Sequence, residues 1–106
     1  MFIVTKKQIR PNTSVEFFSI KNYPQIQEVF KQYMYQIYMS TGKLLDSDET
    51  ISEDGLTKTV VTMWLDEQSA NEWTADPICS ANFTNLYKQH CQDNGITISV
   101  ESRISV

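Results

Sequence analysis

The sequence predicts an α+β domain in which a four-stranded antiparallel sheet carries its helices on one face. Three observations predict this class: β-like runs at both ends of the chain, a long helical stripe after the first of them, and the hairpin-turn dipeptide Asp54-Gly55. Together they give the order strand, helix, strand, strand, helix, strand. The right-handed crossover rule winds that order into a sheet with the strand order 4-1-3-2.

The length and composition allow one such domain over residues 1–106. Hydrophobic residues make up 41% of the chain and charged residues 21%, which is typical of a folded domain. The net charge of -4 disfavours nucleic acid as a partner, because phosphates would be repelled. No apolar run is long enough for a membrane helix and the opening lacks the pattern of a secretory signal, so we expect a cytoplasmic protein with no membrane partner.

The first strand is expected near the start of the chain, where Phe2–Ile9 and Val15–Ile20 both have β-like composition. Pro11 lies between them and marks a turn, a bulge or an edge position, because proline has no backbone donor. The pattern leaves open whether the two runs form a hairpin or one bent strand. Apolar side chains on both faces of Val15–Ile20 favour a central strand that is covered on both sides.

The clearest helix opens at Asn22-Tyr23-Pro24 and ends at Gly42. One of its faces is apolar at helical spacing and is expected to pack against the sheet. This face comprises Ile26, Val29, Phe30, Tyr33, Met34, Ile37 and Tyr38.

A hairpin follows, with strands expected at Lys43–Glu53 and Leu56–Leu65 around Asp54-Gly55. The hairpin is rich in carboxylates, but its sequence lacks the glycine and the final glutamate of a calcium-binding loop. A solvated hairpin that protects the sheet edge is therefore expected, and no metal site.

The second helical region is expected to begin at an N-cap on Asp66, to be interrupted and restarted at Pro77, and to end at Asn94-Gly95. Cys79 and Cys91 would lie about 18 Å apart along this helix, too far for a disulfide, so both are expected to be reduced.

The last strand is expected over residues 96–106, because apolar and polar residues alternate there. Its apolar row comprises Ile96, Ile98, Val100, Ile104 and Val106, and only Ser102 interrupts it.

One face of the predicted sheet has no helices to cover it. Phe17 or Phe18, together with Val61 and Met63 or the residues that alternate with them, are expected on that bare face. A second copy, packed sheet against sheet, would cover them, and closed two-fold dimers are the commonest homo-oligomers. We therefore expect a homodimer through the sheet face, with a ligand or another protein on that face as the competing explanation.

The apolar strand Thr59–Trp64, the helix start Leu65–Gln68, the helical Trp73 and the break at Ala75–Pro77 form a recognisable pattern. With it, the stretch from Lys58 to Asn82 resembles the ferredoxin-like, dimeric α+β barrel superfamily, in particular antibiotic-biosynthesis-type monooxygenases and their heme-degrading relatives. The resemblance implies a dimeric α/β barrel. For the heme-degrading members it also implies a pocket tryptophan, which Trp64 matches, and an iron-binding histidine, whose place is taken by Asn82. Because an amide is a poor iron ligand, no heme or other cofactor is expected.

The sequence leaves enzymatic activity open. The first hypothesis is a small-ligand-binding or interaction module. The alternative is a cofactor-independent monooxygenase that holds a small aromatic, quinol-like substrate in a dry pocket and assists proton movement. The candidate ligand-binding residues are Trp64, Trp73, Tyr33 and Tyr38, and the candidate catalytic residues are His90 and Asn82.

Overall fold

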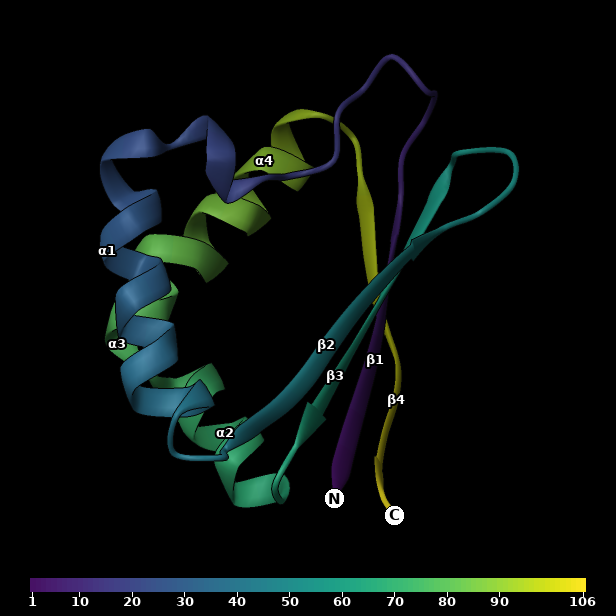
Figure 1. Ribbon diagram of the computed structural model, residues 1–106. Helices are drawn as coiled ribbons and strands as arrows, with labels where there is room; N and C mark the ends of the chain where they lie inside the picture. Colours follow the sequence, from purple (N-terminus) through teal and green to yellow (C-terminus); the bar gives the residue numbers. More distant parts are fainter.

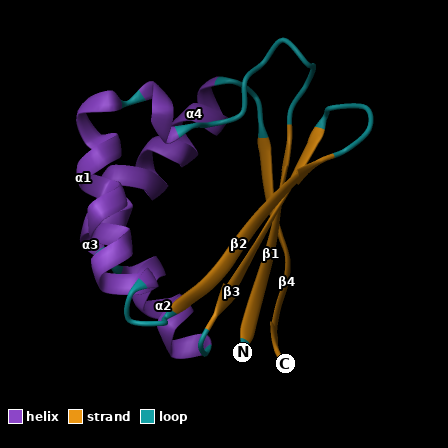
Figure 2. Ribbon diagram, viewed as in Figure 1, coloured by secondary structure: helices purple, strands orange, loops and turns teal.

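The computed structural model describes all 106 residues and places the helices on one face of a four-stranded sheet, leaving the other face bare (Figures 1 and 2). The two chain ends meet at one end of the sheet, where the Val106 amide donates a 2.8 Å hydrogen bond to the Met1 carbonyl. The elements are β1 (Phe2–Ile9), η1 (Ile20–Asn22), α1 (Pro24–Met34), η2 (Tyr35–Met39), β2 (Leu44–Ile51), β3 (Thr57–Trp64), α2 (Glu67–Ala75), α3 (Pro77–Cys79), η3 (Ser80–Thr84), α4 (Asn85–Asp93) and β4 (Thr97–Ser105).

The strand order is β2-β3-β1-β4, which is the predicted order 4-1-3-2 counted from the other edge. All three pairings are antiparallel, and β1 and β3 are the central strands. The β2–β3 hairpin is closed around Gly55, whose φ of 76° lies in the left-handed region that glycine tolerates. The ferredoxin-like α+β class is therefore confirmed.

The expected β-run Val15–Ile20 is wrong, since these residues form neither a hairpin with β1 nor its continuation. Arg10 instead organises a loop by donating hydrogen bonds to the Gly55 carbonyl at 2.7 Å and the Val15 carbonyl at 2.9 Å. Phe18 then packs edge-on against Phe83 of the helical layer, 5.3 Å between ring centroids. Phe17 instead lies beneath the Arg10 guanidinium, whose Cζ is 4.4 Å from the ring centroid, so neither phenylalanine takes a place in the sheet.

The first helix buries a narrower stripe than its sequence predicts. Phe30 and Tyr38 are buried, but Val29 is 71% exposed and Ile37 is 39% exposed, which corrects their assignment to the packed face. The α-helix ends at Met34, and the chain continues as the π-helical segment η2. A π-helical turn holds more residues than an α-helical turn, so the later side chains point in other directions than the α-helical period predicts.

The predicted caps of the second helical region are confirmed. The Asp66 carboxylate accepts a 2.8 Å hydrogen bond from the Ser69 amide at the start of α2. Asp76 accepts one of 2.9 Å from the Ile78 amide, where the chain restarts as α3 at Pro77. Gly95, with φ of 68°, follows the end of α4. Each helical segment therefore begins or ends at a residue that the sequence marks.

The expectation of one apolar row along β4 is wrong beyond Val100, because a bulge interrupts its pairing with β1. Lys6 pairs with Val100, whereas Thr5 pairs with Ser102, so that Glu101 is the extra residue. Beyond the bulge the alternation is reversed: Arg103 shares the helix-facing side with Val4, and Ile104 turns to the bare face beside Ile3.

The bare face of the sheet is apolar at one end only. Ile3, Val61, Met63 and Ile104 gather there by register, and we call these four residues the rear patch. Val61 and Met63 are thus on the bare face as predicted, but the placement of Phe17 or Phe18 there is wrong, because neither belongs to a strand. Beyond the rear patch this face carries polar residues such as Lys7, Thr59 and Ser99.

The largest buried cluster lies between the sheet and the helices, around Phe2, Val4, Trp64, Tyr38 and Cys79. Cys79 and Cys91 are both buried free thiols. None of the helices combines the length and the apolar character needed to cross a lipid bilayer.

Candidate ligand cavity between helices and sheet

A cavity of about 610 Å³ lies between the helical layer and the sheet. All four strands and the helical segments α1, α2, η3 and α4 contribute lining residues. A second hollow, at the tip of the β2–β3 hairpin, is lined only by Ser52, Glu53 and Asp54 and is open surface. The cavity between the helices and the sheet is less open than this hollow and is therefore the candidate site.

Aromatic rings form one wall of this cavity. The Trp64 and Trp73 rings lie 6.2 Å apart, and Phe83 stands edge-on to Trp73 at 6.0 Å. Both indole N–H groups are already engaged: Trp64 donates to Thr62 Oγ1 at 2.9 Å, and Trp73 lies 3.1 Å from the sulfur of Met34. This wall therefore offers ring surface for stacking and no free donor.

Polar side chains form another part of the lining. Strand β1 directs Val4, Lys6 and Gln8 toward the helices, because alternate residues of a strand share a face. The half-buried Lys6 ammonium forms no hydrogen bond and no ion pair. Burial, together with the positive charges of Arg103 and Lys88, lowers the pKa of Lys6.

Gln8 is the second unsatisfied polar group of the cavity. Its side chain is only 6% exposed, and its Oε1 atom accepts no hydrogen bond. A buried acceptor without a donor is uncommon in folded proteins. Lys6 and Gln8 thus line the same cavity, Lys6 with an unpaired donor and Gln8 with an unpaired acceptor that has almost no accessible surface.

The charges around Lys6 are unevenly neutralised. Lys58 forms an ion pair with Glu49 at 3.0 Å. Arg103 has only uncharged partners, Asn71 Oδ1 at 2.8 Å and the Phe2 ring at 5.2 Å, and Lys88 forms no ion pair. The cavity is therefore locally positive in a chain whose net charge is -4.

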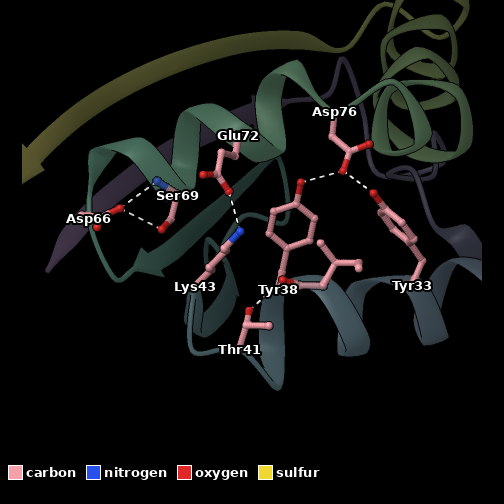
Figure 3. Close-up of polar contacts among 9 residues, drawn as sticks. Tyr33, Tyr38, Thr41, Lys43, Asp66, Ser69, Glu72 and Asp76 are labelled. Carbon is pink, nitrogen blue, oxygen red and sulfur yellow. Dashed lines mark hydrogen bonds and ion pairs between the residues drawn. The ribbon is translucent and has the colours of Figure 1, made fainter.

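Two of the predicted ligand-binding residues, Trp64 and Trp73, line the cavity, whereas Tyr33 and Tyr38 do not. Both tyrosine hydroxyls donate to Asp76 Oδ2, at 2.5 Å and 2.6 Å (Figure 3). The hydrogen bond to Asp76, with burial, raises the pKa of Tyr33 to about 12. Desolvation favours the protonated Asp76 carboxyl, but the hydrogen bonds from the two tyrosines and from the Ile78 and Cys79 amides together outweigh it and lower the Asp76 pKa.

The predicted catalytic residues lie apart from the cavity. His90 Nε2 is 2.7 Å from the Glu16 carbonyl oxygen, and its ring packs near Phe18. Asn82 Nδ2 donates to the Ile78 carbonyl of its own helix at 2.8 Å. Neither side chain lines the cavity, and their catalytic roles stay predictions.

Sequence reasoning missed Lys6 and Gln8. A signal for them exists in the series Phe2, Val4, Lys6, Gln8, which runs along one face of a strand that the topology makes central. A lysine on the covered face of a central strand is unusual enough to indicate a site.

Comparisons with known proteins support the fold. No protein-family model matches the chain, and no curated protein matches it either. A candidate antibiotic biosynthesis monooxygenase from Deinococcus radiodurans superposes with a TM-score of 0.61 at 10% identity, covering 100% of this chain and 92% of that one.

Two further solved structures are similar over nearly their whole length. A dimeric ferredoxin-like protein from an uncultured marine organism has a TM-score of 0.60 at 13% identity, covering 99% of this chain and 94% of that one. A dimeric ferredoxin-like protein of unknown function from a Jannaschia species has a TM-score of 0.57 at 10% identity, with 100% of both chains covered. The chain therefore has the ferredoxin-like α+β fold of these proteins.

Proposed function

We propose that this chain is a cytoplasmic, homodimeric protein that binds a small aromatic ligand between its helices and its sheet. The observation that carries this proposal is the cavity of about 610 Å³ reached by Trp64 and Trp73. Its volume lies within the range of roughly 300–1,000 Å³ that small-molecule sites occupy. A module that served only for self-association would gain nothing from this space, because unfilled apolar volume costs stability.

The lining favours an aromatic ligand. Trp64, Trp73 and Phe83 present ring faces and edges, and flat ligands gain from offset stacking and edge-to-face contacts with such rings. The indole N–H groups are engaged elsewhere, so polar recognition has to come from other lining residues, such as Lys6 and Gln8.

Two observations support self-association. The rear patch leaves Ile3, Val61, Met63 and Ile104 on a face that no helix covers. Two solved structures of this fold are described as dimeric. A second copy with its own rear patch would remove both patches from water, as a two-fold dimer requires.

The proposed cytoplasmic location rests on the buried free thiols. Cys79 and Cys91 are unpaired, and burial raises the pKa of the Cys79 thiol to about 12, which keeps it protonated and unreactive. Such cysteines suit a reducing compartment.

Ligand binding is tested by NMR titration with 2-naphthol, a neutral bicyclic probe. The chain has two tryptophans, so the indole N–H resonances of Trp64 and Trp73 report directly on the cavity wall. We expect both to shift saturably. Val60→Phe, which fills the cavity, should weaken binding, whereas Thr59→Phe on the bare face of the same strand should not. Unchanged indole resonances at millimolar 2-naphthol would refute the proposal.

Self-association is tested by native mass spectrometry. We expect twice the chain mass of 12.3 kDa for the natural sequence. Met63→Lys places a charge in the rear patch and should give the single-chain mass, while Thr59→Lys, outside that patch, should stay dimeric. A single-chain mass for the natural sequence at micromolar concentration would contradict the dimer.

A further inference from the structure

We propose that the cavity selects an anionic hydroxy-aromatic ligand, whose acidic oxygen binds the Lys6 ammonium and whose hydroxyl donates to Gln8 Oε1. This inference rests on the proposed function, since it names the chemical class of molecule that the same cavity takes. The ligand belongs to the para-hydroxybenzoate type: a flat ring with a carboxylate at one end and a phenolic hydroxyl at the other.

The first argument is the unpaired charge of Lys6. Its ammonium lines the cavity from a central strand and has neither a hydrogen bond nor an ion pair. Withdrawing a cation from water without a partner is costly, and the cost is offset when an anion supplies the missing contact. A ligand carboxylate would supply it, because charge-assisted hydrogen bonds are the stronger kind.

The second argument is the sign of the surrounding field. Arg103 and Lys88 lie close enough to Lys6 for their charges to act on it, and both line the cavity. The carboxylate of Glu49 is occupied by Lys58 at 3.0 Å. The cavity around Lys6 therefore attracts an anion and repels a cation, although the chain as a whole is acidic.

The third argument is the unsatisfied acceptor of Gln8. Gln8 follows Lys6 on the same face of β1, so both side chains extend from the sheet toward the helices. Gln8 Oε1 has almost no accessible surface, so the amide has to turn toward the cavity before a ligand hydroxyl can donate to it. A ligand with both a carboxylate and a hydroxyl can then satisfy the free donor of Lys6 and the free acceptor of Gln8 together, with its ring against the apolar lining.

The test uses three probes that share one ring: 4-hydroxybenzoate, its methyl ester and benzoate. Binding is measured by calorimetry on the natural chain. We expect the acid to bind about ten-fold tighter than the ester, since only the acid offers a charged partner. We expect benzoate to bind several-fold more weakly than 4-hydroxybenzoate, because it has no hydroxyl for Gln8.

Matched variants locate the effect. Lys6→Met should abolish the preference for acid over ester, whereas Lys7→Met, its neighbour on the opposite face of β1, should keep it. Gln8→Leu should abolish the preference for 4-hydroxybenzoate over benzoate. The comparison of the three probes on the natural chain decides the question even where a variant does not fold.

The outcomes separate this inference from the proposed function. If the ester binds as tightly as the acid while 2-naphthol still shifts the indole resonances, anion selection is overturned and ligand binding stands. If Lys7→Met loses the preference as fully as Lys6→Met, the assignment to Lys6 is overturned. If no aromatic probe binds, both proposals fail.

Discussion

The hydroxyl of Tyr38 donates a 2.6 Å hydrogen bond to the carboxylate of Asp76, which joins η2 to the start of α3. Tyr33 donates to the same oxygen, and Asp76 also caps the helix through the Ile78 amide. One carboxylate thus holds together helical segments that belong to opposite halves of the chain (Figure 3). This contact therefore joins the two halves of the helical layer to each other.

Tyr38→Phe tests the strength of this contact. Tyr38 is only 2% exposed. Removal of its hydroxyl leaves Asp76 with two other donors, the Tyr33 hydroxyl and the Ile78 amide. We expect a loss of about 1 kcal/mol in the free energy of unfolding, measured by urea denaturation at neutral pH. Tyr35→Phe is the matched control, because that side chain is exposed. An equal loss in both variants would mean that the contact contributes nothing specific.

The free energy of unfolding should depend on pH at acidic values, because the pKa of Asp76 differs between the folded and unfolded states. Its pKa is lowered in the folded state, so its contribution is present above the unfolded-state value of about 3.9 and is lost as the pH falls through the folded pKa. We expect the free energy of unfolding to decrease below about pH 4, and less steeply in Asp76→Asn. Thermal unfolding of both proteins across this range measures the difference. Parallel curves would show that Asp76 is not linked to folding.

Two glycines offer a matched comparison of turn geometry. Gly42 and Gly55 have nearly equal φ, 78° and 76°. A Cβ on Gly42 would meet open space, whereas one on Gly55 would lie 3.3 Å from Thr13 Cγ2. We expect Gly42→Ala to destabilise by about 1 kcal/mol through backbone strain alone. Gly55→Ala should cost more, because the loop held by Arg10 must also move. Urea denaturation measures both, and equal losses would contradict the role given to loop packing.

His90→Ala tests the catalytic role predicted for that residue. Since His90 contacts Glu16 and does not line the cavity, we expect unchanged affinity for 2-naphthol and a stability loss of about 1 kcal/mol. Oxygen uptake with quinol and anthrone substrates is the second measurement. A loss of turnover in His90→Ala without a loss of stability would support catalysis by His90 and count against our placement of the site.

The sequence alone determined the order of the elements and most of their ends. Asp66 and Pro77 mark helix starts, Gly55 marks the hairpin, and the crossover rule then leaves one strand order. These features are local: a cap or a turn depends on residues a few positions apart, and its signal can be found in a short window. Of the four aromatic residues that the sequence offered as candidates for ligand binding, Trp64 and Trp73 line the cavity, whereas Tyr33 and Tyr38 do not.

Only the tertiary structure decided which side chains share the cavity. The bulge in β4 turns Arg103 to the helix-facing side of the sheet, and Phe18 lies outside the sheet and packs against α4 and η3. Both outcomes depend on contacts between segments far apart in the chain, for which a local period carries no information. A one-residue change of register exchanges the two faces of a strand. Lys6 and Gln8 therefore face the helices because of how β1 pairs with its neighbours, whereas the strands themselves can be predicted from the sequence.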